Sequence, residues 1–456
     1  MNLIEINAGD TAWVLISASL VLLMTPALAF FYGGMVRSKG VLNMIMMSVV
    51  SMGIVGVLWV LFGFSVAFGN SWHGLMGNPL QFAGMRGLFD ATVGSEGHQI
   101  PAFAFAGFQA AFAVIAVALI SGAVADRMKF GAWMAFSAAW AAVCYFPAAH
   151  WVFAFDGFMA THGGWIANDV KAFDFAGGTA IHINAGAAAL ALAIVLGPRI
   201  GFRTTPMRPH NLTLVMLGAG LLWFGWFGFN AGSALAADGL AAMVWVNTLA
   251  AAAAGMLGWL VTERLRDGHA TSLGAASGIV AGLVGITPGC SVVTPLGSLA
   301  IGALTGAGCA LAIGLKYRVG LDDSLDVVGV HLAGGLIGTL AAGLFAKGSL
   351  ADGAAGLFYG GGLEQLGRQA LGAAAVLAYS LLLSLLLAVA LDRMIGLRVD
   401  ARAEGAGIDL AEHAESGYDL SRVQYSSYSK SIVLPRLPAP EAAETIEDTD
   451  KEGVPA

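Results

Sequence analysis

Two apolar stretches of the chain each combine an aspartate with a histidine, residue types that can bind and exchange protons. Asp174 precedes His182 in the first stretch, and Asp326 precedes His331 in the second. An ionisable side chain at membrane depth is costly and usually faces a helix-bundle interior or a transport pathway. Each histidine is followed by small residues that permit close helix packing. The pair therefore predicts one shared site, although either histidine alone could simply bond neighbouring backbone.

Two other apolar stretches carry aromatic side chains at helical spacing. Phe108 and Phe112 share one helix face, and Phe229 and Ser233 share another. Aromatic faces attract small cations, and a hydroxyl can accept a hydrogen bond from an N–H donor. Aromatic stripes are more often packing surfaces, but the added hydroxyl favours a small-cation site. Phe153, at the end of another apolar stretch, could complete its aromatic wall.

The composition is that of a polytopic membrane protein. The 456 residues are 57% hydrophobic and only 11% charged, whereas soluble proteins carry about 25% charged residues. The three cysteines show neither metal-ligand spacing nor a disulfide framework. The HExxH and GxSxG motifs are absent, which argues against an enzyme. Nothing in the sequence indicates a cofactor, a bound metal or a nucleic-acid partner.

Apolar segments long enough to span a bilayer, about 20 residues, divide the chain into elements that would position these side chains. We predict an all-α protein with eleven spans, of which the eighth is short and rich in glycine. The segments are 11–35, 43–68, 101–125, 131–153, 177–197, 211–235, 240–262, 271–287, 295–315, 326–346 and 370–392. The short acidic N-terminus lacks the basic region of a signal peptide, so the first span is expected to be retained.

The positions of basic residues predict the orientation of these spans. Fourteen lysines and arginines fall on one side of the alternating loops and four on the other. The positive-inside rule then places the N-terminus outside and the C-terminus in the cytoplasm, as an odd number of spans requires. His182 lies on the fifth span and His331 on the tenth, which predicts two inverted five-helix repeats followed by an eleventh helix.

The predicted domain division follows from a change in composition. Residues 1–395 form the membrane domain, and residues 396–456 form a cytoplasmic tail of mixed charge. The end of this tail, Leu434–Ala456, is rich in proline, alanine and glutamate and is expected to be disordered.

Several motifs, in order along the chain, resemble the ammonium transporter (Amt/Mep/Rh) family, and in particular its bacterial Amt type. The resemblance spans about residues 11–420 and is carried by Tyr32–Lys39, Phe108–Phe112, Asp174–Gly186, Gly225–Ser233 and Asp326–His331. It implies a homotrimer in the inner (plasma) membrane, with one pore per protomer for ammonium or its analogue methylammonium. It also implies that the tail can contact a PII-type regulatory protein.

The resemblance further implies roles for individual residues. His182 and His331 would be the twin pore histidines, Phe112 and Phe229 the stacked gate, Ser233 part of the outer ammonium site and Asp174 its supporting aspartate. The further candidates are Trp226, Phe108, Gln109 and Asp326.

One position departs from the family pattern. Where the family often has tryptophan in the outer cation site, this chain has Phe153, and phenylalanine has a weaker cation–π face. Either Phe153 substitutes for it, or Trp151 or Trp165 reaches in.

The expected mechanism is recruitment of ammonium outside, deprotonation near Ser233 and Asp174, and passage of ammonia along a hydrophobic pore. Whether the proton follows, which would make transport electrogenic, stays open.

Two alternative functions also stay open. One is an ammonium sensor with the same fold, although the tail of about 60 residues carries no signalling domain. The other is an Rh-like channel for another small neutral gas.

Overall fold

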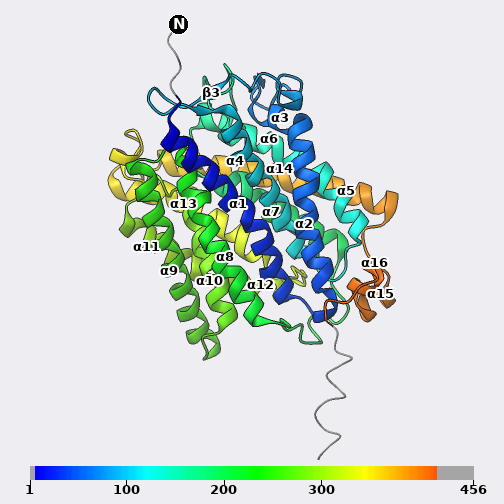
Figure 1. The fold of residues 1–456 in the computed structure, drawn as a ribbon. Helices are drawn as coiled ribbons and strands as arrows, with labels where there is room; N and C mark the ends of the chain where they lie inside the picture. The colour runs from blue at the N-terminus through cyan, green and yellow to red at the C-terminus, as the bar shows by residue number, and fades with distance from the viewer. Residues whose placement is uncertain (1–5, 419–456) are drawn as a thin grey trace, which may run out of the picture. The chain divides into compact units, whose positions relative to one another are not determined.

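The structure is a computed structural model, and its described residues run from 6 to 418. The predicted tail beyond residue 418, including the expected disordered segment Leu434–Ala456, lies outside the described residues. Helices dominate the described part (Figure 1), and the compact unit that they form extends to Gly417.

The helices of the first half are interrupted by short 3-10 or π turns, labelled η. Their bounds are α1 Ala8–Met35, η1 Ser38–Gly40, α2 Val41–Leu58, η2 Trp59–Gly63, α3 Phe64–Phe68, η3 Ala83–Met85, α4 Ala102–Ile120, η4 Ser121–Val124, α5 Phe130–Trp140, η5 Ala141–Tyr145, α6 Phe146–Phe153, η6 Ile166–Val170, η7 Gly178–Ile183 and α7 Asn184–Leu196. Two small antiparallel hairpins lie between α3 and α4: β1 Ser71–Trp72 with β2 Met76–Gly77, and β3 Thr92–Val93 with β4 Ile100–Pro101.

The second half also consists of α-helices interrupted by short 3-10 or π turns. Its helices are α8 Leu212–Ala231, η8 Gly232–Ala234, α9 Gly239–Asp267, α10 Ser272–Ile286, α11 Pro295–Ala312, α12 Leu315–Val319, η9 Val328–Leu332, α13 Ala333–Phe345, η10 Gly348–Leu350, η11 Leu357–Tyr359, α14 Glu364–Ile395, α15 Ala401–Ala406 and α16 Ile408–His413.

Within residues 6–418, ten helical segments are long and apolar enough to cross a membrane. They coincide with ten of the predicted spans, which confirms a multi-pass helical membrane protein. The predicted eighth span corresponds to α10, which is apolar but only 15 residues long. The total of eleven spans therefore stays a prediction.

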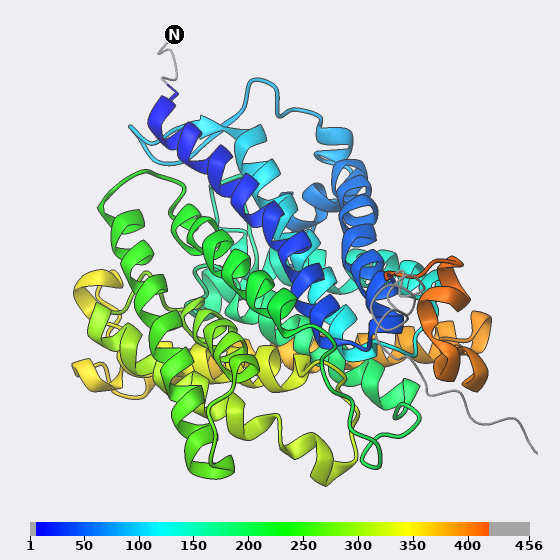
Figure 2. The same cartoon turned by 60° about the horizontal axis from the view of Figure 1, so that its bottom comes forward.

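Helices α1 and α8, the first helices of the two predicted repeats, pack side by side (Figures 1 and 2). Glycines on α8 allow this approach: a β-carbon on Gly218 would lie 2.4 Å from the backbone nitrogen of Phe31, and one on Gly225 would lie 2.4 Å from Cγ of Met24. Small residues that let helix backbones meet are typical of helix pairs in lipid. We call this contact the glycine seam; it comprises Gly218, Gly225, Gly228 and Gly232.

Both histidine-bearing helices begin with a π turn instead of an α turn. His182 lies in η7, which continues into α7, and His331 lies in η9, which continues into α13. A π turn inserts an extra residue into the helix and often marks a functional site. The two turns contact each other, so the widened turns place the two histidines together.

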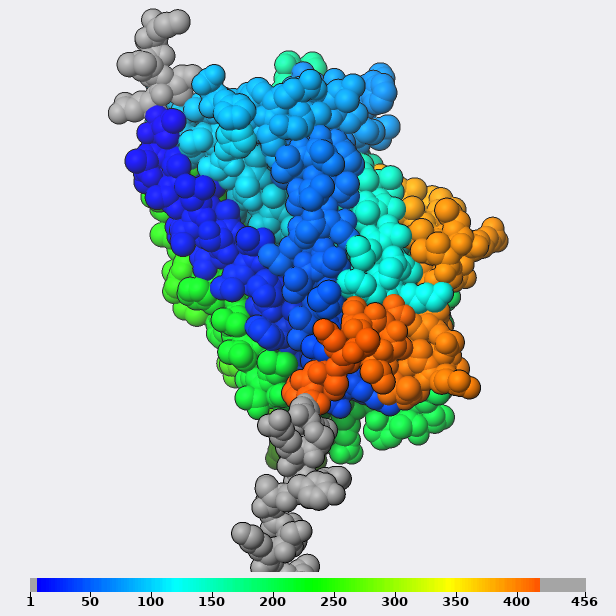
Figure 3. All heavy atoms as spheres, turned by 45° about the vertical axis from the view of Figure 1, so that its right-hand side comes forward, coloured from blue at the N-terminus to red at the C-terminus, as the bar shows by residue number. Residues whose placement is uncertain are grey.

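The described part of the tail packs against the helices. Figure 3 shows α15 and α16, in orange-red, against the blue segment that begins α2 and the cyan α5. The Asp409 carboxylate accepts the N–H groups of Leu42 and Asn43 at 3.1 and 2.8 Å, and Glu412 accepts the N–H of Phe130 at 2.8 Å. Free N–H groups at helix starts favour such carboxylates. Burial raises the pKa of Asp409, which the two N–H donors oppose.

Candidate functional site

Four cavities follow one another through the helix bundle. We call the side where α1 begins the N-terminal face and the side where α15 and α16 pack the tail face. From the N-terminal face to the tail face, the volumes of the four cavities are about 160, 10, 10 and 660 Å³. The second and third share Val280 and His331 as lining residues, and the third and fourth share Met35, Leu325 and Asp326. The row is thus wide at both ends and narrow in the middle.

The first cavity, which we call the vestibule, has an aromatic wall with one hydroxyl. Ser233 donates to the carbonyl of Phe229 at 2.8 Å, which leaves its oxygen able to accept a hydrogen bond from a ligand. The lining residues are Phe105, Phe108, Gln109, Phe112, Phe153, Phe155, Phe158, Phe175, Ala176, Ser233 and Leu235. Many aromatic faces and a hydroxyl acceptor suit a small N–H-bearing cation.

The structure separates the three residues suggested for completing this wall. Phe153 lines the vestibule, whereas Trp151 and Trp165 are not among its lining residues. The Trp151 indole donates to the carbonyl of Leu75 at 2.6 Å and packs against Trp165 and Tyr379. Of these three residues, Phe153 is therefore the one that faces the vestibule.

Two stacked phenylalanines separate the vestibule from the narrow cavities. The rings of Phe112 on α4 and Phe229 on α8 lie 4.3 Å apart at 22°, and both side chains are buried. Phe108 packs edge-on against Phe112 at 4.7 Å. The stacked rings leave no room for a molecule between them.

His182 and His331 lie together beyond this stack. Their rings are parallel within 20° with centroids 5.3 Å apart, and their Nδ1 atoms are 3.3 Å apart. One Nδ1 must donate and the other accept in such a contact. Within the described residues, Nε2 of His182 is buried without a protein partner. Since buried polar atoms are nearly always bonded, this nitrogen is available to a ligand in the narrow cavity that it lines.

Trp226 fixes the histidine pair from one side. Its indole ring stacks on His182 with centroids 5.5 Å apart, and its Nε1 donates to the hydroxyl of Thr287 at 3.0 Å. The other residues around this narrow cavity are apolar: Met24, Leu28, Ile115, Leu119, Ile181, Leu222, Phe229 and Val280. Its volume of about 10 Å³ is close to what one water molecule occupies.

Asp174 caps the start of the first histidine helix. Its carboxylate accepts four backbone N–H groups, from Gly177, Gly178, Thr179 and Ala180, at 2.8, 2.5, 2.8 and 3.1 Å, and the hydroxyl of Thr179 as well. Four N–H groups at a helix start otherwise lack partners. Both carboxylate oxygens therefore hold the start of η7.

Asp323, not Asp326, makes the matching contacts in the second half. Asp323 accepts the N–H groups of Val327, Val328 and Gly329 at 3.0, 2.7 and 3.4 Å. It lies eight residues before His331, as Asp174 lies eight residues before His182. The sequence analysis paired Asp174 with Asp326 and missed this residue, although the equal spacing could have indicated it.

Asp326 has a different place in the structure. It pairs with Lys316 at 2.6 Å and lines the third and fourth cavities. Its backbone is left-handed, with φ of 63°, and Gly177 at the corresponding position of the first half has φ of 118°. Few residues other than glycine adopt this conformation, so the chain turns into both π segments in the same unusual way.

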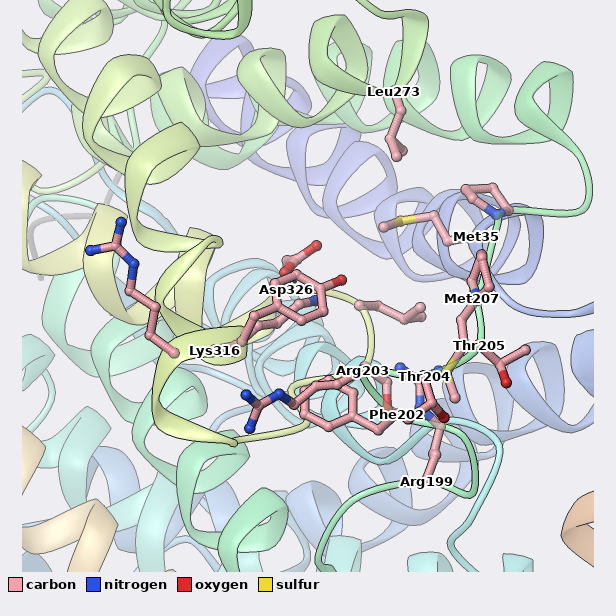
Figure 4. Close-up of a pocket in the computed structure, with 16 residues that line it drawn as sticks. Met35, Arg199, Phe202, Arg203, Thr204, Thr205, Met207, Leu273, Lys316 and Asp326 are labelled. Atoms are coloured by element: carbon pink, nitrogen blue, oxygen red, sulfur yellow. Dashed lines mark hydrogen bonds and ion pairs between the residues drawn. The ribbon is translucent and has the colours of Figure 1, made fainter. Parts of the chain in front are cut away.

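The fourth cavity opens widely at the tail face (Figure 4). Figure 4 shows Lys316 and Asp326 across the cavity from Met207 and Thr205 of the loop that follows α7. Arg199 binds the Asp322 carboxylate with two contacts of 2.9 Å, the bidentate geometry that guanidinium favours. The ion pairs make this mouth polar.

A second, buried arginine holds the same loop. Arg127 donates to the carbonyl of Asp322 at 2.7 Å and to the hydroxyl of Ser324 at 2.5 Å. Burial lowers the pKa of Arg127 to about 10, which the nearby Asp322 carboxylate opposes. The loop that carries the capping Asp323 is therefore fixed from both sides.

The arrangement of these cavities restricts what can pass. An ion that enters the narrow apolar section loses its water shell at a large cost, whereas a small neutral molecule that forms hydrogen bonds can fit and bond to His182. The site can therefore gather a cation in the vestibule and conduct a neutral molecule beyond the phenylalanine stack.

Comparison with known proteins gives consistent matches. A family model described as "Ammonium Transporter Family" matches residues 12–418. Proteins named ammonium transporter from Mycobacterium bovis and Bacillus subtilis are 59% and 45% identical to this chain; the alignments cover 97% and 90% of this chain and 94% and 98% of those proteins.

Solved structures match the fold as well. A structure described as "Sensor Amt Protein" has a TM-score of 0.82 at 31% identity and covers 89% of this chain and 98% of its own. That of Saccharomyces cerevisiae Mep2 has a TM-score of 0.78 at 31% identity, with 87% and 89% covered.

Proposed function

The chain belongs to the ammonium transporter family, and from this premise we propose that the four cavities together form its conduction pathway. The protein transports ammonium across a membrane. One observation supports the proposed pathway most: the buried, unpartnered Nε2 of His182 lies in a cavity about the size of one water molecule, directly behind the stacked phenylalanines.

The vestibule is the proposed recruitment site. Ammonium contacts the aromatic wall, including Phe153, and donates to the hydroxyl oxygen of Ser233. Aromatic contacts with a cation contribute about 0.5–2 kcal/mol each, which offsets part of the lost hydration. Gln109 and Phe108 complete the wall toward the phenylalanine stack.

Ammonium gives one proton to water in the vestibule, near Ser233 and Asp174, before it passes Phe112 and Phe229; the vestibule, at about 160 Å³, has room for that water. Ammonia then continues through the narrow section, where it donates or accepts hydrogen bonds with the histidine pair. Asp174 holds the start of the His182 helix in place. Neutral histidines bond ammonia without a fixed charge, so metal cations gain nothing that replaces their water shell.

The proposed orientation has the N-terminal face outside the cell and the tail face in the cytoplasm. Eleven spans, with α10 as the eighth, are arranged as two inverted repeats of five and a final helix, α14. The matched Asp–His spacing and the matched π turns support this repeat, and the excess of basic residues in the tail-face loops supports the orientation. We place the protein in the plasma membrane as a homotrimer.

The tail is the proposed regulatory part. Its docking on the starts of α2 and α5 through Asp409 and Glu412 gives it a defined position beside the cytoplasmic mouth. A partner such as a PII-type protein could act by shifting this position, because a segment couples sites only if it has two arrangements that a ligand biases.

Removing the docked tail tests this idea. Truncation after Leu397 should leave a membrane-inserted trimer whose initial uptake rate falls by about fivefold or more, the lower range of typical coupling effects. Truncation after Tyr428, which keeps α15, α16 and all their described contacts, is the matched control and should transport like the parent. Both are compared at equal membrane levels; equal rates near the parent rate would exclude a regulatory tail.

A sensor with the same fold is the second candidate, because the structure described as "Sensor Amt Protein" matches this chain. The fold does not separate the two functions, but flux does. A protein that only reports ammonium needs no flux, whereas the pathway proposed here requires it.

The decisive experiment measures uptake of labelled methylammonium into proteoliposomes that contain the full chain. We expect saturable uptake that ammonium competes away and that potassium does not. Repeating it with the membrane potential clamped or released shows whether the proton's charge crosses too. Binding without uptake would reject the conduction pathway in favour of the sensor.

A further inference from the structure

A buried aspartate at the start of α1 lies outside the pathway described above. Asp10 is only 3% exposed, although it lies at the N-terminal face, where a carboxylate would ordinarily remain hydrated. The sequence analysis gave it no role. Its contacts point toward the vestibule.

The two oxygens of Asp10 hold two different loops. Oδ1 accepts the N–H of Ala237 at 2.7 Å, and Oδ2 contacts Nδ1 of His98 at 2.8 Å. An ionised carboxylate only accepts hydrogen bonds, so this nitrogen of His98 carries the proton in the contact. The side chain of His98 is 45% exposed. Asp10 thus joins the loop before α4 to the segment after α8.

The segment after α8 is the one that supplies Ser233 and Leu235 to the vestibule wall. Leu235 has a left-handed backbone, with φ of 56°, a conformation that persists in such residues only where surrounding contacts impose it. The N–H of Leu235 donates to the carbonyl of Gly232. Two residues further on, the N–H of Ala237 donates to the carboxylate of Asp10. Asp10 therefore holds the chain just beyond the turn that contains Ser233.

Two further contacts fasten α1 to the same segment. The Trp13 indole donates to the carbonyl of Ala231 at 3.2 Å. A β-carbon on Gly232 would lie 2.5 Å from Cβ of Ser17 and 3.0 Å from the ring of Phe108. The first turns of α1 and the vestibule wall are thus in direct contact, and Asp10 is the carboxylate in this contact.

We propose that Asp10 is a positioning residue for ammonium recruitment: it holds the turn 232–237 so that the Ser233 hydroxyl faces the vestibule. This inference rests on the proposed recruitment role of the vestibule. Asp10 touches neither the phenylalanine stack nor the histidine pair. Its loss should therefore weaken recruitment and leave the maximal rate of conduction intact.

The test is the concentration dependence of methylammonium uptake by the full chain in proteoliposomes. For Asp10→Ala we expect KM to rise about tenfold, which corresponds to about 1.4 kcal/mol, with maximal rate unchanged. Asp10→Asn keeps an oxygen that can accept the Ala237 N–H, so it should restore most of the affinity. If Asp10→Ala does not insert into the membrane, Asp10→Ser takes its place, because the serine side chain is too short to bond both loops.

Asn7→Ala is the matched control. Asn7 caps the same helix start and donates to the carbonyl of Gly97, but it makes no described contact with residues 231–237. It should keep the parent KM. A KM increase equal to that of Asp10→Ala would reduce Asp10 to general stabilisation of the helix start and overturn the proposal.

Ser233→Ala separates the proposal from its premise. If this variant keeps the parent KM, the vestibule is not the recruitment site, and the role of Asp10 falls with it. If Ser233→Ala raises KM and Asp10→Ala does not, the recruitment site stands and the positioning role of Asp10 is rejected.

Discussion

With alanine in place of His182 or His331, we expect the initial rate of ammonium uptake to fall by about tenfold or more, the effect of losing one hydrogen bond of about 1.4 kcal/mol. The two rings share a contact of 3.3 Å between their Nδ1 atoms. Removing either ring takes away the partner that fixes the other, and it leaves a larger space that water can enter. A water-filled pore could also admit potassium, so cation selectivity is measured together with uptake.

The histidine experiment needs proof that the variants are intact and a histidine that should not matter. Trimer size after extraction provides the first. His269→Ala provides the second, because His269 is exposed in the loop between α9 and α10. If both pore variants transport at the parent rate and still exclude potassium, the histidine pair has no part in conduction.

For Asp174→Ala, we expect transport to be abolished. Asp174 is the acceptor for four backbone N–H groups and one hydroxyl, and each buried donor left without a partner costs about 1–3 kcal/mol. Such a loss is enough to unwind the start of η7 and displace His182. Asp174→Asn retains one acceptor oxygen, so it should keep the fold and transport at a reduced rate. Initial uptake rate and thermal stability are measured for each variant.

Asp238→Ala is the control for the loss of an ordinary helix cap. Asp238 accepts the N–H of Ala241 at the start of α9 and is exposed, so its removal costs about 1 kcal/mol without disturbing the pathway. The assignment of Asp174 fails if Asp174→Ala transports as well as Asp238→Ala does.

The sequence predicted the membrane-spanning part of each helix better than the residues at which the helix ends. The apolar pattern located the span at 240–262, but α9 continues to Asp267 through Glu263, Arg264 and Arg266. Likewise α14 begins at Glu364 although the predicted span begins at 370. Hydropathy reports the part of a helix that fits an apolar environment, whereas the helix itself continues into polar sequence until a cap or a turn stops it.

The site was predictable in its residue types and less so in its contacts. Spacing placed Phe108 with Phe112 on one face, but the stacking of Phe112 on Phe229 joins two distant helices and was expected only from a family resemblance. Three aspartates, Asp322, Asp323 and Asp326, lie in one short polar stretch. Which of them caps η9 depends on the left-handed turn at Asp326, a property of the folded loop that composition does not reveal.

The width of the narrow cavity depends on the glycine seam, although none of the seam glycines lines that cavity. Met24 and Leu28 of α1 and Leu222 and Trp226 of α8 line the same narrow cavity, so the distance between the two helix axes sets its width. Hydrogen atoms in place of side chains hold that distance near its lower limit. A methyl group at one of these glycines would push α1 and α8 apart and widen the narrow cavity between them. In the proposed pathway, a substitution at one of these glycines would therefore change the size of the molecule admitted without altering either histidine.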